Sequence, residues 1–453
     1  MPYSRIDVVD PRTRYRKHGM PFLWGTKAAM IQPDIVRVTL KGIGDAAPVG
    51  SLASLNEGNE AGGICHGIDL EYCRGGMVLQ DITLHSAPGM GIVEHAGDGG
   101  TRIVGLRIVP GPPPPGATKP RLLTTSWDGI LHTEVRRGPI VERCTIEDCG
   151  DDTWSVQSSP LLVVKSEREG IVLAGSIDLR PGDHLLRSLD SPAWTVRTVR
   201  RVPLKEAMLD AAIVDRLDKA PQWTLWSISH DTVQIVSLDL ASPAPPAVGT
   251  SVYSPENQGS GFIFRNNRAH SSGRILIKAG DGLVENNILR DGHNVVVMPE
   301  VSAGGAFGIA RVTIRNNRII GAENFNTMPW SLQAGGLCVG GQADSPAGSF
   351  TDITIEGNTF EDISAANIWI SSVRGLTLKG NRFLRPCQRP LSNSGADFGV
   401  EHSAVVRLRN CDRVHIARNM IEAPGPYTKQ GISLDKTVTK VTNAGDGIRI
   451  QER

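Results

Sequence analysis

A short alternating pattern recurs along the C-terminal half of the chain. Each copy has an apolar–polar alternation, then a polar pair ending in asparagine, then another apolar residue. The copies are GFIFRNNRA (261–269), GLVENNILR (282–290), VTIRNNRII (312–320), ITIEGNTFE (353–361), LTLKGNRFL (376–384) and VHIARNMIE (414–422). The successive asparagines are 20, 30, 41, 23 and 38 residues apart. A coil of about 20 residues fits two or three short strands joined by tight turns, so the pattern predicts a solenoid.

A solenoid of short strands is a parallel β-helix, because each coil buries its inward face only by stacking on the next. Asparagine at one place in every coil tolerates the left-handed conformation of a sharp bend, and stacked amides can form a hydrogen-bonded ladder. A β-propeller would require a recurrent aromatic signature, and aromatic residues make up only 5% of the chain. We therefore predict an all-β protein built on a right-handed parallel β-helix.

The pattern is interrupted between residues 160 and 256. Segments such as LLVVKSEREGIVLAG and WTVRTVRRVPL alternate apolar and polar residues, and turn signals such as RPGD separate them, but no asparagine bend occurs. This pattern favours a small antiparallel β-barrel inserted between two coils. The predicted domains are 1–159, the N-terminal part of the β-helix; 160–256, the inserted barrel; and 257–453, the C-terminal part of the β-helix.

Composition narrows the class of protein. Fifty glycines and 29 prolines in 453 residues are typical of a turn-dense β protein and exclude a helical bundle. A net charge of +1 lacks the basic excess that nucleic acid requires. Seven cysteines without a CxxC pair argue against a zinc ribbon and a paired disulfide framework.

The apolar segments of the sequence bear on its compartment and partners. The chain shows no apolar segment of signal-peptide or membrane-spanning type. We expect no membrane partner and a cytoplasmic location, or a secreted or periplasmic one if a leader has been removed.

Carboxylates lie one coil apart just before the insertion. Asp151 and Asp152 follow Asp128 by 23 and 24 residues, so the three should lie on neighbouring rungs, about 4.8 Å apart if directly stacked. Carboxylates held together repel one another, which raises the pKa of at least one of them. A protonated and an ionised carboxyl group are what glycoside hydrolysis requires. The alternative is that these aspartates only cap surface turns.

The residues around these acids resemble glycoside hydrolase family 110, the α-1,3-galactosidases. The resemblance covers roughly residues 65–300 and includes EYCRGGMVLQDITLHSAPGMGIVE, DGILH, RGPIVERCTIEDCGDD and FRNNRAHSSGRILIKAGDGLVENN. It implies a β-helix with an inserted barrel, the aspartates Asp128, Asp151 and Asp152 as catalytic residues, and inversion at a terminal α-1,3-galactoside. After the aspartates the family tends to read Ala-x-Asn-x-His, whereas this chain has TWSVQ. The Gly-Asp-Asp triplet also resembles polygalacturonases, without their Gly-His-Gly.

We assign Asp151 as general acid, and Asp128 and Asp152 as candidates for the base that activates water. The candidate substrate-binding residues are polar or aromatic residues near these acids on the expected coils: His132, Trp154, Trp127, Arg274, Lys278, Glu94 and Glu300. Each has a structural alternative. The tryptophans can belong to the core, His132 can be a structural histidine, and the charged side chains can form a solvated sheet face.

The predicted function is an exo-acting, inverting glycoside hydrolase with an oligosaccharide or glycan substrate. No cofactor is expected, and no spacing of His, Cys or acidic residues predicts a metal site. Two alternatives stay open: a polysaccharide lyase or polygalacturonase-like endo-hydrolase acting on an acidic polymer, and a non-catalytic carbohydrate-binding β-helix.

Overall fold

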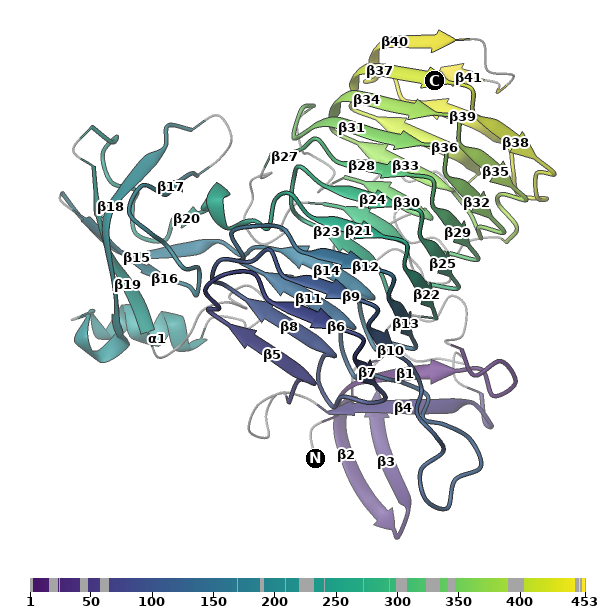
Figure 1. Cartoon of the computed structure of the whole chain (residues 1–453), viewed down its shortest axis with the longest axis horizontal. Helices are drawn as coiled ribbons and strands as arrows, with labels where there is room; N and C mark the ends of the chain where they lie inside the picture. The colour runs from purple at the N-terminus through teal and green to yellow at the C-terminus, as the bar shows by residue number, and fades with distance from the viewer. Residues whose placement is uncertain are drawn as a thin grey trace.

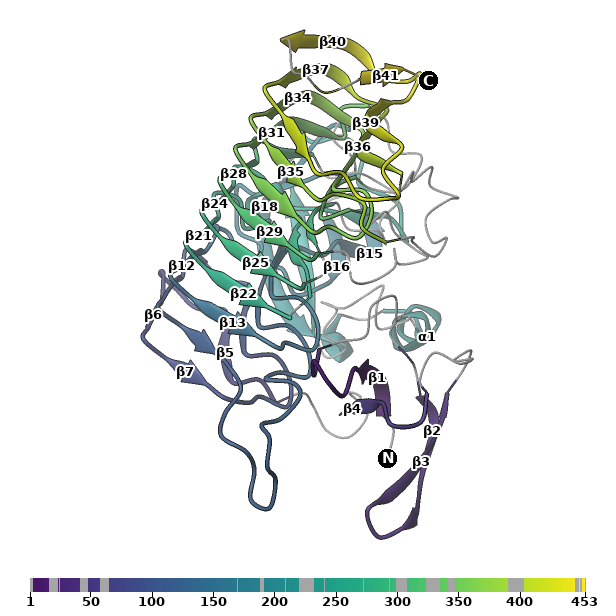
Figure 2. The same cartoon turned by 90° about the vertical axis from the view of Figure 1, so that its right-hand side faces the viewer.

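A computed structural model describes residues 3–15, 23, 25–40, 48–57, 65–168, 170–187, 191–207, 209–219, 232–239, 241–271, 273–292, 294–298, 308–322, 335–340, 347–389, 403–444, 448 and 450–452. Three long sheets of parallel strands run along one axis and wrap around a common interior (Figures 1 and 2). This is a parallel β-helix, as the asparagine repeat predicted.

Successive strands enter the sheets in the order first, second and third, up to the C-terminal end, where the last described coil adds no strand to the third sheet. The first sheet contains β5 (Ile68–Glu71), β8 (Ile92–His95), β11 (Ile130–Thr133), β14 (Trp154–Gln157), β23 (Ile275–Ile277), β26 (Val295–Val297), β30 (Leu337–Val339), β33 (Ile368–Ser371), β36 (Ala404–Arg409), β39 (Gln430–Leu434) and β41 (Ile450–Glu452). Along each of its strands, successive side chains point alternately into the interior and to the outer face, as they do in any pleated strand. Ile92, Ile130, Trp154, Ile275 and Val295 occupy equivalent positions and form part of the buried core.

The second and third sheets complete the coils. The second sheet contains β6 (Val78–Gln80), β9 (Arg102–Val104), β12 (Ile140–Glu142), β21 (Ile263–Arg265), β24 (Leu283–Glu285), β28 (Thr313–Arg315), β31 (Phe350–Glu356), β34 (Val373–Lys379), β37 (Asp412–Ala417) and β40 (Thr439–Ala444), with β27 (Ile309–Ala310) beside β31. The third contains β7 (Thr83–Leu84), β10 (Arg107–Ile108), β13 (Thr145–Glu147), β22 (Arg268–His270), β25 (Ile288–Arg290), β29 (Arg318–Ile320), β32 (Thr359–Glu361), β35 (Arg382–Leu384) and β38 (Met420–Glu422).

The repeated asparagines form a buried ladder at the bend between the second and third sheets. The backbone N–H of each donates to the side-chain oxygen of the next, at 2.9–3.1 Å, through Asn267, Asn287, Asn317, Asn358, Asn381 and Asn419. The left-handed residue of the bend is not the ladder asparagine but the residue before it, for example Asn286 (φ 55°) or Gly357 (φ 64°). Asparagine at the ladder position is therefore explained by the hydrogen-bonded amides and not by tolerance of a left-handed backbone.

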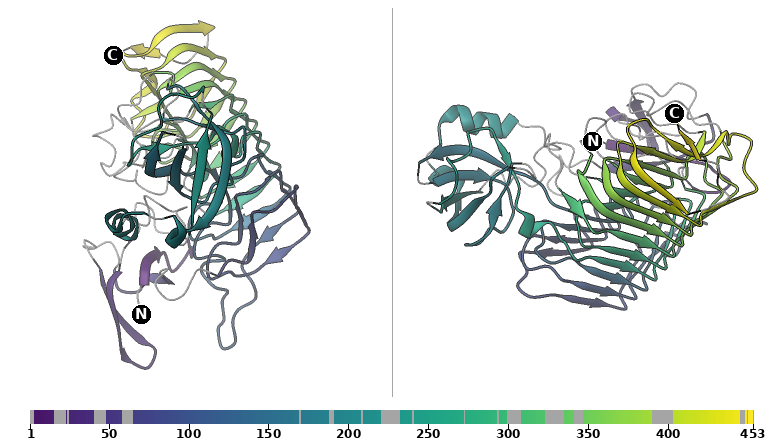
Figure 3. Two further views of the ribbon diagram at one scale, coloured as in Figure 1. Left: turned by 90° about the vertical axis from the view of Figure 1, so that its left-hand side faces the viewer. Right: turned by 90° about the horizontal axis from the view of Figure 1, so that it is seen from above.

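The interruption between β14 and β21 holds a six-stranded antiparallel sheet. Its strands are β15 (Leu161–Glu167), β16 (Gly170–Ala174), β17 (His184–Leu185), β18 (Trp194–Pro203), β19 (Thr232–Leu238) and β20 (Ser251–Val252), in the order β17-β18-β19-β16-β15-β20. Leu186 and Tyr253, next to the two end strands, exchange backbone hydrogen bonds of 2.9 and 2.8 Å, so the sheet closes on itself. It stands beside the N-terminal coils of the β-helix (Figure 3).

Short helices accompany this sheet: η3 (Leu204–Glu206), α1 (Ala211–Lys219) and η4 (Pro255–Asn257). One face of the sheet encloses Leu161, Leu173 and Val236, and the other packs with Leu217 of α1. In the described part of the chain, no helix has the length and apolar character that a membrane crossing requires.

The N-terminal region differs from the predicted division of the chain. Residues 1–159 were all expected to belong to the β-helix, but its first described strand is β5. Before it, β1 (Tyr3–Val9) pairs antiparallel with β4 (Leu52–Glu57), and β2 (Gly25–Gln32) pairs antiparallel with β3 (Ile35–Leu40). These strands carry no asparagine bend and join none of the three parallel sheets.

Candidate active site

Strand register places two of the predicted acids on neighbouring coils. Ile130 of β11 pairs with Trp154 of β14, so Asp128 and Asp152, each two residues earlier, occupy equivalent positions. The Gly129 N–H donates to the Asp152 carbonyl at 2.8 Å, which ties the two segments together.

Asp151 joins them because the chain bends just before β14. The Asp151 N–H donates to the carbonyl of Trp127 at 3.1 Å. The bend depends on close approach at Gly150, where a Cβ would lie 2.2 Å from the carbonyl oxygen of Ser126. On the next coil, a Cβ at Gly273 would lie 2.1 Å from the carbonyl oxygen of Asp151. Glycine at both positions therefore lets adjacent acids turn to the same side.

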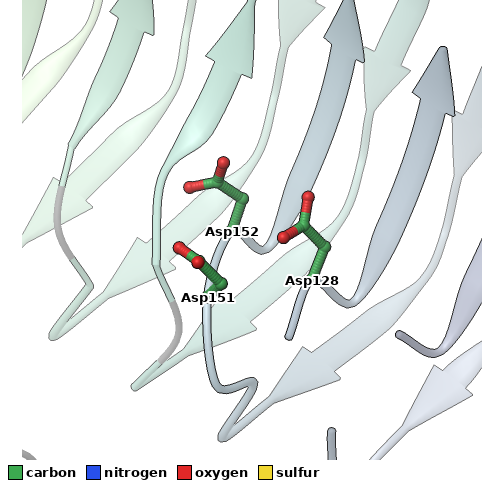
Figure 4. Close-up of side chains that lie close together, drawn as sticks. All are labelled: Asp128, Asp151 and Asp152. Atoms are coloured by element: carbon green, nitrogen blue, oxygen red, sulfur yellow. The ribbon is translucent and has the colours of Figure 1, made fainter. Parts of the chain in front are cut away.

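The three carboxylates gather at one place on the outer side of the first sheet (Figure 4). One oxygen from each lies within 4.8 Å of the others. The Asp128 and Asp152 residues are buried, with 7% and 3% of their surfaces exposed. The Asp151 side chain is 20% exposed and is the most accessible of the three. The structure thus brings together the acids that the sequence spacing selected.

Arg274 supplies the positive charge at this cluster. It precedes β23, and its side chain donates to both oxygens of Asp152, Nε to Oδ1 at 2.5 Å and Nη2 to Oδ2 at 2.9 Å. Nη2 also lies 3.8 Å from Oδ1 of Asp151. A group of oxygens this close is also of the kind that holds a cation, but here a guanidinium already binds Asp152.

Burial and charge give two of the carboxylates raised pKa values. Burial raises the pKa of Asp128 well above its ordinary value, and the charges of Asp152 and Asp151 add to that effect. A hydrogen bond from Ser155 and the charge of Arg274 act in the opposite direction. Burial also raises the pKa of Asp152, with Arg274 opposing it. These two carboxyl groups therefore hold a proton to higher pH than an exposed aspartate does.

Two of the candidate substrate-binding residues lie inside the β-helix instead. His132 and Glu94 face each other on β11 and β8, both fully buried, and Nδ1 of His132 lies 2.8 Å from Oε2 of Glu94. The other Glu94 oxygen accepts from the Thr101 hydroxyl at 2.6 Å. Because Ile130 points inward, His132 two residues later also points inward. In this arrangement neither side chain faces the carboxylates, which corrects their assignment as sugar-contacting residues.

The two tryptophans separate. Trp154 is fully buried in the interior, with its ring stacked on Phe264 at a centroid distance of 4.8 Å, so it belongs to the core instead of forming a stacking platform. Trp127 is half-buried and packs against Met90, Val93 and Leu131 on the outer side. A sugar contact by Trp127 therefore stays a prediction.

The remaining candidates have mixed outcomes. Lys278 follows β23, is half-buried and lies on the same face as Arg274 by alternation. Glu300 lies outside the described residues. Ser155 was not among the candidates, although its hydroxyl donates to Asp128 at 2.9 Å and it is fully buried. Its only sequence signal is its place one residue after Trp154, which alternation turns to the outer side.

The inserted barrel contacts the other end of the first-sheet strands. Tyr72 donates its hydroxyl to the Ser176 carbonyl at 2.9 Å, and Arg136 pairs with Asp183 at 2.6 Å. These coil residues follow β5 and β11, whereas the carboxylates precede β11 and β14. The barrel therefore borders the outer face of the first sheet about one strand length away from the acids.

Fold and site together define a parallel β-helix with an acidic, arginine-bound cluster on its outer surface. No protein-family model and no curated protein matches this chain.

Solved structures similar to it include a thermostable GH87 α-1,3-glucanase catalytic unit from Streptomyces thermodiastaticus, at 12% identity and a TM-score of 0.36, covering 84% of this chain and 49% of that one. The Dettilon tailspike protein matches at 11% identity and a TM-score of 0.33, covering 84% of this chain and 61% of that one. The enzymatically active domain of tailspike protein 2 from bacteriophage CBA120 matches at 10% identity and a TM-score of 0.27, covering 82% of this chain and 43% of that one. The chain thus spans about half the length of the first of these structures.

Proposed function

We propose that the protein is a glycoside hydrolase that cleaves a terminal α-1,3-linked galactoside or a related glycoside with inversion. One observation carries the proposal: three carboxylates on neighbouring coils, with oxygens within 4.8 Å, two of them with raised pKa values. Carboxyl groups that hold and release a proton near neutral pH are the requirement of acid–base glycoside cleavage. The linkage and sugar follow from the resemblance to family 110 alone.

The roles follow from exposure. Asp151 is the most accessible acid, so it is the one that can reach a leaving-group oxygen and donate a proton to it. Asp128 and Asp152 lie behind it and receive a proton from water. Their oxygens lie within 4.8 Å of one another, so one water molecule can reach hydrogen-bond distance of more than one carboxylate.

The short separation of the carboxylates also suits a retaining route, since retaining enzymes hold their acids about 5–5.5 Å apart and inverting ones about 6.5–9.5 Å apart. A retaining enzyme needs a carboxylate oxygen that can attack the sugar carbon. Asp128 and Asp152 are both buried, and Arg274 engages both oxygens of Asp152. Water can enter such a site more readily than a sugar carbon can, which supports inversion.

A panel of 4-nitrophenyl α- and β-glycosides together with α-1,3-linked galactobiose tests the activity. Proton NMR of the first-formed sugar tests the stereochemistry, and a product that keeps the substrate's anomeric configuration would contradict inversion. An unsaturated, ultraviolet-absorbing product from an acidic polymer would identify a lyase. Binding without turnover in the wild-type protein would identify a carbohydrate-binding β-helix.

A further inference from the structure

The two stacked carboxylates have different partners. Asp152 accepts two hydrogen bonds from the Arg274 side chain and a third, at 3.3 Å, from the Arg274 backbone N–H. Within the described part of the chain, the Asp128 carboxylate accepts a side-chain hydrogen bond from the neutral hydroxyl of Ser155 at 2.9 Å. A forked, charge-assisted pair stabilises an ionised carboxylate more strongly than one hydroxyl does.

We propose that Arg274 and Ser155 are positioning residues that make Asp128 and Asp152 unequal in their tendency to ionise. Arg274 favours the ionised form of Asp152 over that of Asp128, so Asp152 is the base, while Ser155 orients Asp128, which carries the proton of the pair in the resting protein. This inference rests on the proposed hydrolase function for its chemistry, and it divides the roles that the proposed function leaves shared. It also changes Arg274 from a substrate-binding residue to one that acts through Asp152.

Charge balance supports the inequality. The groups that face Asp128 are Asp152, Asp151, Arg274 and Ser155, and those that face Asp152 are Arg274, Asp151 and Asp128. With one guanidinium among three carboxylates, full ionisation would leave excess negative charge in a buried place. Asp151 carries one proton as the general acid, and the second proton that relieves this charge is best held where the positive charge is farther away, which is at Asp128.

The division gives each group one task. Water attacks the anomeric carbon as the glycosidic bond breaks, and its proton passes to Asp152. Asp151 gives its own proton to the leaving oxygen. The neutral Asp128 accepts a hydrogen bond from the water and takes no proton from it. Solvent then returns a proton to Asp151 and removes one from Asp152.

Stability against pH tests the inequality without any substrate. An aspartate whose folded pKa lies above its unfolded value of about 3.9 costs the folded state stability as pH rises between those two values. Asp128→Asn removes this titration, so its urea midpoint should exceed the wild-type value at pH 8 by more than at pH 4.5. Asp152→Asn strands the buried Arg274 charge, so its midpoint should fall below wild type at both pH values.

An Asp128→Asn midpoint at or below wild type at pH 8 would overturn the proposal, as would an Asp152→Asn midpoint at or above wild type. These measurements decide the point even if no glycoside in the panel is hydrolysed, in which case the proposed function fails separately.

Kinetics test the same division where a substrate is found. Asp152→Asn should lower kcat at least about 100-fold. The loss of kcat in Asp128→Asn should be at least about 10-fold smaller than that, because an amide mimics a neutral carboxyl. Arg274→Lys, which loses the fork, should shift the acidic limb of kcat/KM to higher pH. The matched control is Arg265→Lys, since Arg265 pairs with Glu142 at 2.7 Å outside the site.

Ser155→Ala should lower kcat without moving the acidic limb, because that limb reports Asp152. An Arg274→Lys profile that coincides with that of the Arg265→Lys control, or an equal loss in the Asp128 and Asp152 variants, would overturn the assignment.

Discussion

Replacing one asparagine of the ladder tests how much of the β-helix depends on its amides. The Asn358 side chain makes four hydrogen bonds. Its oxygen accepts from the backbone N–H and the side-chain amide of Asn317, both at 3.0 Å. Its nitrogen donates to the Ile314 carbonyl at 2.9 Å and to Asn381 at 3.0 Å. All of these groups are buried. Asn358→Ala leaves the Asn317 backbone N–H without its acceptor, whereas the Asn317 side chain keeps the Val284 and Arg315 carbonyls as acceptors and the Asn381 oxygen keeps the backbone N–H of residue 358.

The expected loss follows from that count. Each of the four hydrogen bonds contributes about 1 kcal/mol net, and a buried donor left unpaired adds a further penalty of about 1–3 kcal/mol, so Asn358→Ala should lower the free energy of unfolding by about 5–7 kcal/mol. Asn267 lies at the upstream end of the ladder, where its side chain bonds only Cys144 N–H at 2.9 Å and the Val141 carbonyl at 3.0 Å. Asn267→Ala therefore breaks two bonds instead of four and also leaves one buried N–H unpaired, so it should cost about 2 kcal/mol less than Asn358→Ala.

Urea unfolding followed by circular dichroism measures both losses, provided that fluorescence gives a coincident transition. Hydrogen exchange adds a local measurement, because the Asn317 amide loses its acceptor in Asn358→Ala and should exchange faster. A loss below about 1 kcal/mol, or equal losses at the two positions, would refute the count of bonds as the source of stability.

The remaining predictions concern the core, the outer tryptophan and the barrel contact. Trp154→Leu should lower the free energy of unfolding by about 3 kcal/mol, because it removes the ring stacked on Phe264; a loss under about 1 kcal/mol would place it outside the core. Trp127→Leu should raise KM several-fold for a glycoside substrate and leave the urea midpoint nearly unchanged; an unchanged KM would remove its role. Burial lowers the pKa of His95, but its 2.9 Å hydrogen bond to Glu134 outweighs this and raises it. Stabilisation by this pair should be complete below pH of about 6.5 and fade as pH rises through the folded pKa, so the stability gap between wild type and Glu134→Gln should shrink from pH 5.5 to pH 9; a constant gap would contradict it.

The repeat pattern predicted the coils because their periodicity is a property of the chain itself. Asn287 and Asn358 stand at equivalent bends because each follows the same alternation, and the one-coil spacing of Asp128 and Asp152 placed them in register for the same reason. Which side chains of a strand point into the interior was harder to predict. Spacing alone does not say whether His132 or Leu131 points inward, since a shift of one residue exchanges the two faces of a strand.

Contacts between residues that are distant in sequence could not be predicted for a related reason. Arg274 and Asp152 are 122 residues apart, and their pairing depends on β23 stacking directly on β14 across the insertion. The sequence suggested Arg274 as a residue of the outer face but carried no sign that it would bind the acid itself. Helix α1 was also missed, although AAIVDRLDK is rich in good helix formers.

The insertion has a consequence for the order in which the chain folds. In the C-terminal coils the ladder asparagines that bond directly are separated by as few as 20 or 23 residues, so these contacts close short loops. The strands on either side of the barrel must instead find each other across 122 residues, and contacts of high sequence separation form slowly. The C-terminal coils are thus placed to nucleate early, while the acid cluster, which needs both sides of that long loop, matures only when the two halves of the solenoid have joined.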